Sequence, residues 1–128
     1  MIEHVMVPAS NYQKSKKFYT ALLKPLGYKQ TMESGQAAGF KEGGHTSFWI
    51  AKKKKVLPTH VAFGAKSKKA VQEFYKAGLK AGGKDNGGPG FRLNYGPTYY
   101  AAFVYDPDGS NMEACYFGER APEAKKKK

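Results

Sequence analysis

The 128-residue sequence has little cysteine, tryptophan and arginine: one, one and two residues. The single cysteine, Cys115, cannot form an internal disulfide bond, which is typical of a reducing compartment and predicts a cytoplasmic protein. No apolar run is long enough to cross a bilayer, so we expect no membrane partner. Met1 leads directly into a strand-like pattern, and we recognise no signal peptide.

Acidic residues are also scarce, at 10 against 22 basic residues, which gives a formal net charge of +12. Such a charge attracts phosphate, but 20 of the basic residues are lysines, and only Arg92 and Arg120 offer the forked donors that base recognition favours. The lysine runs at 52–55 and 125–128 read as a solvated loop and tail. We therefore expect no specific nucleic-acid partner, and attraction of an anionic small molecule is the other hypothesis for the charge.

The sequence contains an internal duplication. The stretch "HVMVPAS" from His4 returns as "HVAFGAK" from His60, at an offset of 56 residues. The same offset relates further pairs without a gap: Phe18 and Phe74, Tyr19 and Tyr75, Leu23 and Leu79, Gly27 and Gly83. A register kept through a strand, a helix and the following glycine indicates two copies of one structural unit.

Each copy predicts a strand, a helix and three further strands. In the first copy, Ser10 and Gln13 form a capping box, and the helix ends near Lys24 because Pro25 cannot occupy an interior turn. In the second copy, Ser67 caps a helix that ends at 82–83, and the turn at 106–109 joins the last two strands. The expected strands are 3–8, 28–33, 37–41 and 46–51, then 60–65, 90–95, 99–105 and 111–116.

Neither copy can cover its own sheet, so the two must pack together. We expect an α+β domain at 1–118, with βαβββ modules at about 1–55 and 56–118, and a basic tail at 119–128. The eight strands would form a curved mixed sheet with the helices outside and a concave inner face. Ligands are expected in that hollow.

Three side chains are candidates for chemistry in the hollow. His4 and His60 open the two modules at equivalent positions, and Glu113 lies on the last strand, facing the same side as Asn111 and Cys115. An inward carboxylate needs a partner, and two imidazoles with one carboxylate can occupy one face of an octahedral metal site. The alternative is two ordinary hydrogen-bonded histidines and a surface glutamate.

The stretches "HVMVPASNYQKSKKFYTALLKPLGY", "HVAFGAKSKKAVQEFYKAGLKAGG" and "YYAAFVYDPDGSNMEACYF" resemble the vicinal oxygen chelate superfamily, which includes glyoxalase I, bleomycin resistance proteins and extradiol dioxygenases. The resemblance implies paired βαβββ modules, frequent homodimers that sometimes complete the cleft across chains, and one divalent metal: Zn, Ni, Mn or Fe(II). Carried over, the metal ligands fall on His4, His60 and Glu113, with Glu113 also catalytic. Trp49 stands where glyoxalase-like members have a fourth ligand, a glutamate.

The resemblance predicts a metal-dependent, glyoxalase-like lyase or related enzyme acting on a small molecule with vicinal oxygens. Isomerisation, thiol transfer and oxygen insertion remain open, and the alternative is a non-catalytic sequestration protein of bleomycin-resistance type. Arg92 is the expected anion clamp. The other expected cleft residues are Trp49, Asn94, Tyr95, Tyr99 and Tyr100.

Overall fold

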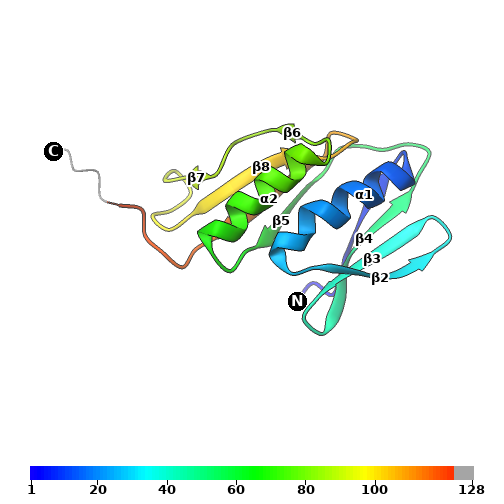
Figure 1. The fold of residues 1–128 in the computed structure, drawn as a ribbon, viewed down its shortest axis with the longest axis horizontal. Coiled ribbons are helices and arrows are strands. Elements are labelled where there is room, and N and C mark those ends of the chain that lie inside the picture. Colours follow the sequence, from blue (N-terminus) through cyan, green and yellow to red (C-terminus); the bar gives the residue numbers. More distant parts are fainter. Residues whose placement is uncertain (123–128) are drawn as a thin grey trace.

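The structure is a computed structural model that describes residues 1–122, so the predicted lysine tail at 125–128 lies outside the described part. The strands form two sheets (Figure 1). The first has the order β1-β4-β3-β2, and the second has the order β5-β9-β8-β6 with β7 also on β8. Their bounds are β1 Val5–Ala9, β2 Lys29–Ser34, β3 Ala37–Glu42, β4 His45–Lys52, β5 His60–Gly64, β6 Lys84–Asp85, β7 Gly90–Phe91, β8 Tyr100–Tyr105 and β9 Asn111–Tyr116.

The predicted α+β class is confirmed, but the expected single eight-stranded sheet is divided into a four-stranded and a five-stranded sheet. The division follows the duplication, because all strands of the first sheet precede those of the second. In each sheet the first strand of the module runs parallel to the last: β1 beside β4, and β5 beside β9.

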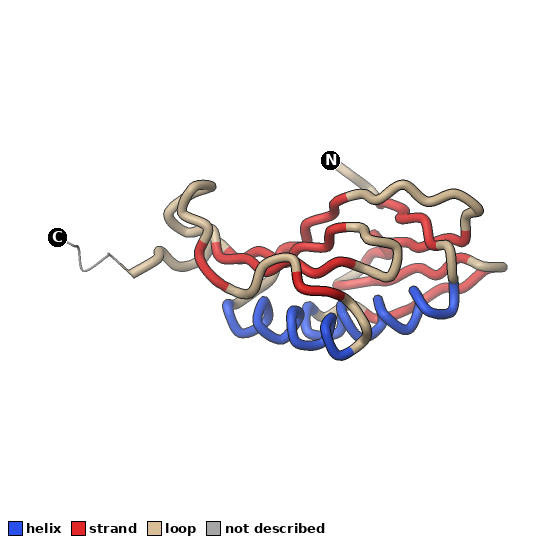
Figure 2. Tube along the Cα trace, turned by 90° about the horizontal axis from the view of Figure 1, so that it is seen from above, coloured by secondary structure: helices blue, strands red, loops and turns tan. Residues whose placement is uncertain are grey.

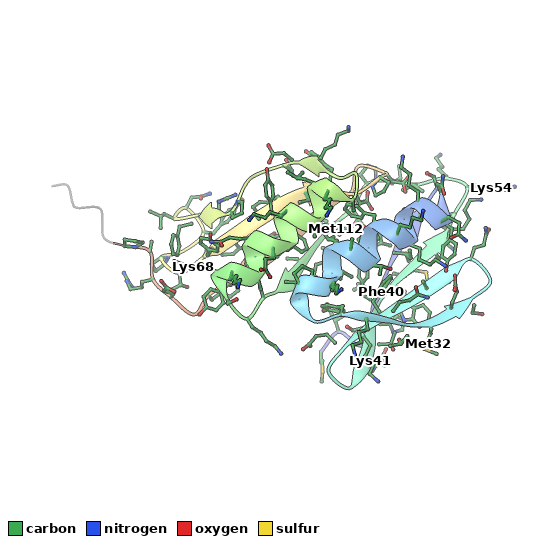
Figure 3. All side chains as sticks on the ribbon, in the orientation of Figure 1. Met32, Phe40, Lys41, Lys54, Lys68 and Met112 are labelled. Atoms are coloured by element: carbon green, nitrogen blue, oxygen red, sulfur yellow. The ribbon has the colours of Figure 1, made fainter. Side chains whose placement is uncertain are left out.

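The helices α1 (Tyr12–Leu23), η1 (Lys24–Leu26) and α2 (Lys68–Lys80) lie on one side of the strand layer (Figure 2). Strand residues such as Val7, Ile50 and Phe63 point toward them and are buried in the core. Phe40 and Met112, labelled in Figure 3, belong to this shared core, whereas Met32 on β2 is exposed. Within residues 1–122, no helix covers the opposite face, which we call the open face. None of the helices in residues 1–122 is long and apolar enough to cross a membrane.

The two helix starts test the predicted caps. Ser67 caps α2 as predicted, since its hydroxyl accepts from the Ala70 backbone N–H at 3.0 Å. The cap predicted for α1 is wrong: Asn11, not Ser10, accepts from Lys14 N–H, at 3.1 Å. The offset of 56 relates Ser67 to Asn11, so the duplication gives the correct cap where the local capping-box pattern does not.

The predicted strand at 90–95 is also wrong beyond Phe91. After β7 the chain turns back on itself: Arg92 N–H donates to Tyr99 O at 2.7 Å, and Tyr95 N–H donates to Arg92 O at 2.9 Å. Pro97 lacks a backbone N–H and cannot continue a ladder, which is one reason the segment forms a loop. This loop, at 92–99, carries four of the predicted cleft residues: Arg92, Asn94, Tyr95 and Tyr99.

Side-chain contacts hold the two modules together. The Tyr19 hydroxyl on α1 donates to the buried Asp106 carboxylate at 2.5 Å, and that carboxylate also accepts the N–H groups of Asp108 and Ser110. Asp106 is part of the predicted turn, which is confirmed by the Gly109 N–H bond to Asp106 O at 2.9 Å. Ser10 donates its N–H and hydroxyl to Asp108 in the same turn. The turn of the second module is therefore fixed to the start of the first helix.

We predict that Tyr19→Phe lowers the free energy of unfolding by about 1–3 kcal/mol, because a buried carboxylate oxygen loses its donor. The matched control is Tyr75→Phe, which removes an exposed hydrogen bond to Asp85 at the equivalent repeat position and should change the free energy by less than about 0.5 kcal/mol. Urea unfolding followed by circular dichroism measures both. Equal effects of the two substitutions would contradict a special role for the Tyr19–Asp106 contact.

Candidate functional site

The open face carries two cavities of about 650 Å³ each, one on each sheet. Strand alternation explains their walls, since residues next to buried core positions in sequence point away from the helices. The first cavity is lined by residues that include Glu3, His4, Met6, Met32, His45 and Trp49. The second is lined by His60, Asn94, Tyr95, Tyr99, Phe103, Asn111 and Glu113.

Glu113 lines the second cavity, although it is only 3% exposed. In the parallel ladder, His60 pairs with Asn111 and Ala62 with Glu113, which places His60 and Glu113 on the same face. His60 Nε2 lies 2.8 Å from Glu113 Oε1, and the Tyr99 hydroxyl donates to Glu113 Oε2. Both carboxylate oxygens therefore have donors, which offsets the cost of burying the charge.

The surroundings of Glu113 control two further protons. Burial raises the pKa of Tyr99 well above its usual value, and the hydrogen bond to Glu113 and its negative charge raise the pKa further. Burial, followed by the charge of Glu113, raises the pKa of the Cys115 thiol. At neutral pH Tyr99 is therefore a proton donor, and Cys115 is a protonated thiol directed at Phe63 O rather than a thiolate nucleophile.

The first cavity has a different polar cluster. The Glu3 carboxylate contacts His4 Nδ1 through one oxygen, and its other oxygen lies 2.9 Å from His45 Nε2. The hydrogen bond from His4 lowers the pKa of Glu3, so its carboxylate is ionised at neutral pH. All three side chains are at least half exposed.

The structure thus brings two of the three predicted metal ligands together and separates the third. His60 and Glu113 share the second cavity, whereas His4 lies in the first with Trp49. A smaller cavity of about 380 Å³, lined by His60 with Ile2 and Val5 among others, lies where the two sheets meet. Within residues 1–122 of one chain, no three His, Cys, Asp or Glu side chains are arranged to hold a metal ion.

Trp49 occupies the position in the first module that Glu113 occupies in the second. Met6 pairs with Trp49 in the β1–β4 ladder, and Ala62, which the offset of 56 relates to Met6, pairs with Glu113 in the β5–β9 ladder. The indole packs over Gly39, where an added Cβ would lie 3.0 Å from it. The first module therefore presents an apolar ring where the second presents a carboxylate.

The other predicted cleft residues have different surroundings. Tyr95 lines the second cavity with Asn94 and Tyr99, and the Tyr95 and Tyr99 ring centroids are 5.1 Å apart. Arg92 lies 5.2 Å above the Phe103 ring, but its guanidinium also donates to the backbone oxygens of Gly88 and Gly90.

Tyr100 lines neither of the two large cavities. It points to the helix side, where its hydroxyl accepts from Gln72 of α2 at 2.9 Å. The strand pattern explains this placement, because Tyr100 and the cavity residue Phe103 are an odd number of positions apart on β8 and face opposite sides.

Sequence reasoning did not find the contacts made by Glu3, His45 and Phe103. Two signals were available: Glu3 directly precedes His4, and His45 directly precedes the predicted strand at 46–51. Tyr99 was expected in the cleft, but its bond to Glu113 depends on the loop after β7, which the sequence pattern read as a strand.

We predict that Tyr99 stays protonated at about pH 11, above the usual tyrosine pKa. Wild-type protein and Tyr99→Phe should therefore give the same tyrosinate absorbance at 295 nm. In Glu113→Gln the pKa of Tyr99 should fall, but stay raised because burial remains. Circular dichroism at the same pH shows whether the fold is intact, and a lower absorbance for folded Tyr99→Phe would contradict the assignment.

The sequence model of the Glyoxalase/Bleomycin resistance protein/Dioxygenase superfamily matches residues 1–114. Among curated proteins, no sequence matches the chain. Among solved structures, the chain is similar to a glyoxalase/bleomycin resistance protein from Albidiferax ferrireducens T118, at 30% identity, with a TM-score of 0.79 and coverage of 89% of this chain and 97% of that one.

Two more distant structures share the fold. A putative glyoxalase from Bacillus halodurans is 22% identical, with a TM-score of 0.70 and coverage of 91% and 95% of the two chains. Lactoylglutathione lyase from Agrobacterium tumefaciens is 17% identical, with a TM-score of 0.69 and coverage of 91% and 92%. The family model covers most of the chain, including the residues that line both open-face cavities. The chain therefore belongs to the glyoxalase/bleomycin resistance protein/dioxygenase superfamily.

Proposed function

We propose that the protein is a divalent-metal-dependent enzyme acting on a small molecule with vicinal oxygens, and that each site is completed between two chains. Members of the superfamily commonly use a divalent metal, are usually dimeric and take small-molecule ligands. The observation that carries the proposal is the pairing of His60 with the buried carboxylate of Glu113, in which Nε2 and Oε1 lie 2.8 Å apart. An imidazole and a carboxylate are ligands that suit divalent first-row metals such as Zn, Ni, Mn or Fe(II).

The donor set fits a metal only if a second chain supplies His4. Within one chain His4 lies on the first sheet, away from the cavity of His60 and Glu113. In a two-fold dimer, the open face of the first sheet in one chain can oppose the open face of the second sheet in the other. Such a dimer contains two equivalent sites, each with His4 from one chain and the His60–Glu113 pair from its partner.

When bound, a divalent metal would act as a Lewis acid that stabilises negative charge on the substrate oxygens. The residues of this chain then have distinct roles. Tyr99, whose pKa is raised, holds a proton beside Glu113 and fixes the direction of the carboxylate. His60 must carry its proton on Nδ1 when Nε2 serves as a ligand. Trp49, Tyr95 and Phe103 give the assembled cleft apolar walls.

Glu113 is the proposed catalytic carboxylate, because Trp49 leaves the first module without an equivalent acid. This difference from the glyoxalase-like pattern removes one protein base from the cleft. The reaction can be isomerisation, thiol transfer or oxygen insertion. Which of these occurs depends on the substrate groups that can exchange a proton with Glu113 or Tyr99.

A second candidate function is metal-independent sequestration of a small molecule. It is favoured by the apolar lining of the first cavity, where Met6, Met32 and Trp49 lie together. Metal uptake separates the two functions. If the protein binds no metal, and added ligand quenches its Trp49 fluorescence, the sequestration function is favoured.

We predict a stoichiometric metal site and a dimer for the wild-type protein, with loss of metal in His4→Ala, His60→Ala and Glu113→Ala. Mixing His4→Ala with Glu113→Ala should restore metal binding, because each mixed dimer contains one site with all three ligands. Random exchange of chains makes half of the dimers mixed, which restores about a quarter of the wild-type metal content. Elemental analysis after unfolding and refolding the mixture measures this content.

The matched control is a mixture of His60→Ala with Glu113→Ala. Both changes fall in the second module, so no pairing of these chains gives a complete site, and no metal should return. Recovery in neither mixture, with a full site in the wild type, would exclude a site shared between chains. A monomeric mass in sedimentation would exclude the dimer.

A further inference from the structure

The His4–Glu3–His45 cluster in the first cavity is not explained by the proposed function alone. One carboxylate oxygen of Glu3 meets Nδ1 of His4, and the other lies 2.9 Å from Nε2 of His45. His45 Nε2 is also 2.9 Å from the Glu3 backbone oxygen. The Glu3 carboxylate therefore bridges two of the three histidines of the chain.

The contact with Glu3 determines which nitrogen of His4 carries the proton. A carboxylate accepts hydrogen bonds, so Nδ1 of His4 is the protonated nitrogen, and Nε2 keeps a free lone pair. Histidines that bind metals commonly donate their second ring N–H to a carboxylate in this way. Nε2 is thus the ring nitrogen of His4 that is free to bind a metal.

His45 supplies the second contact that an exposed carboxylate needs. The Glu3 side chain is 67% exposed, and a single contact at such a position would hold it weakly because solvent competes and side-chain entropy opposes it. Two contacts from His45, to the side chain and to the backbone of Glu3, restrict both ends of the residue. His45 is itself fixed at the start of β4.

The second module offers an internal comparison. The offset of 56 relates Glu3 to Thr59, which has no carboxylate, and the Thr59 backbone N–H instead donates to Ser110 Oγ at 3.1 Å. His60 makes its carboxylate contact through Nε2 to Glu113. Of these two histidines, His4 is therefore the one that contacts a carboxylate through Nδ1. It is also the proposed ligand from the module that has no carboxylate ligand.

We propose that Glu3, anchored by His45, is a positioning residue that holds His4 in the Nδ1–H tautomer with Nε2 directed to the metal. The inference rests on the proposed function, in which His4 is a ligand. It adds two residues to the site, and neither has to touch the metal or the substrate.

Long-range ¹H–¹⁵N spectra of metal-free protein labelled with ¹⁵N-histidine, recorded at about pH 8, read the tautomer directly. His4→Ala assigns the signals. We expect Nδ1–H in the wild type and a shift toward Nε2–H in Glu3→Ala, with a smaller shift in His45→Ala. Glu3→Gln should keep the wild-type tautomer, because its amide oxygen still accepts the proton.

Zinc affinity, measured by competition with a chromophoric chelator, gives the second readout. Glu3→Ala should weaken zinc binding by about 10- to 100-fold, the range found for partners of ligating histidines. Glu73→Ala, which removes an exposed negative charge from α2, is the matched control and should bind like the wild type. A loss in Glu3→Ala without a tautomer change would mean that only charge is involved and would overturn the positioning role.

The two proposals can fail separately. If His4→Ala retains full zinc binding, the proposed metal site is wrong whatever tautomer His4 adopts. If His4→Ala loses zinc while Glu3→Ala keeps both the tautomer and the affinity, the metal site stands and the role of Glu3 is wrong. An Nε2–H tautomer in the wild-type protein would also overturn the positioning role.

Discussion

Packing of both helices on one side of both sheets is the constraint on which the other features depend. Neither sheet can bury its apolar face alone, so α1 and α2 pack together over a common core, and Phe48 of the first sheet meets Phe63 of the second at 5.1 Å. The Tyr19–Asp106 hydrogen bond fixes the same arrangement at the ends of the modules. Because the helices occupy one side, the polar and aromatic residues of alternate strand positions are left on the open face.

The duplication gives each module the same framework but different chemistry. Ladder registers place Trp49 and Glu113 at equivalent positions beside the first strand of each module. One half-site therefore offers an apolar ring with His4, and the other offers a buried carboxylate with His60 and Tyr99. In the proposed two-fold dimer, one of each would meet at two equivalent sites.

Carboxylate contacts also distinguish the histidines of the site. Glu113 is buried and needs the donors that His60 and Tyr99 supply, so its environment is fixed by desolvation. Glu3 is exposed and depends on two contacts from His45 for its position. The two carboxylates thus hold the two imidazoles by different physical means. Buried Glu113 holds His60 because an unpaired buried charge would be costly. Exposed Glu3 holds His4 because the contacts with His45 restrict the Glu3 side chain.

The sequence by itself determined both α-helices and most of the strands. The 56-residue offset gave the two repeated units and the equivalence of His4 and His60. The local pattern before the second helix gave the Ser67 cap, and strand alternation put Asn111 and Glu113 on one side, because these patterns follow local geometry. It did not determine the loop at 92–99, the contact of Ser10 with Asp108, or the division into two sheets. Those depend on contacts between residues far apart in the chain. Only the tertiary structure separated His4 from Glu113, because the distance between two half-sites is set by how the modules pack and not by the pattern within either one.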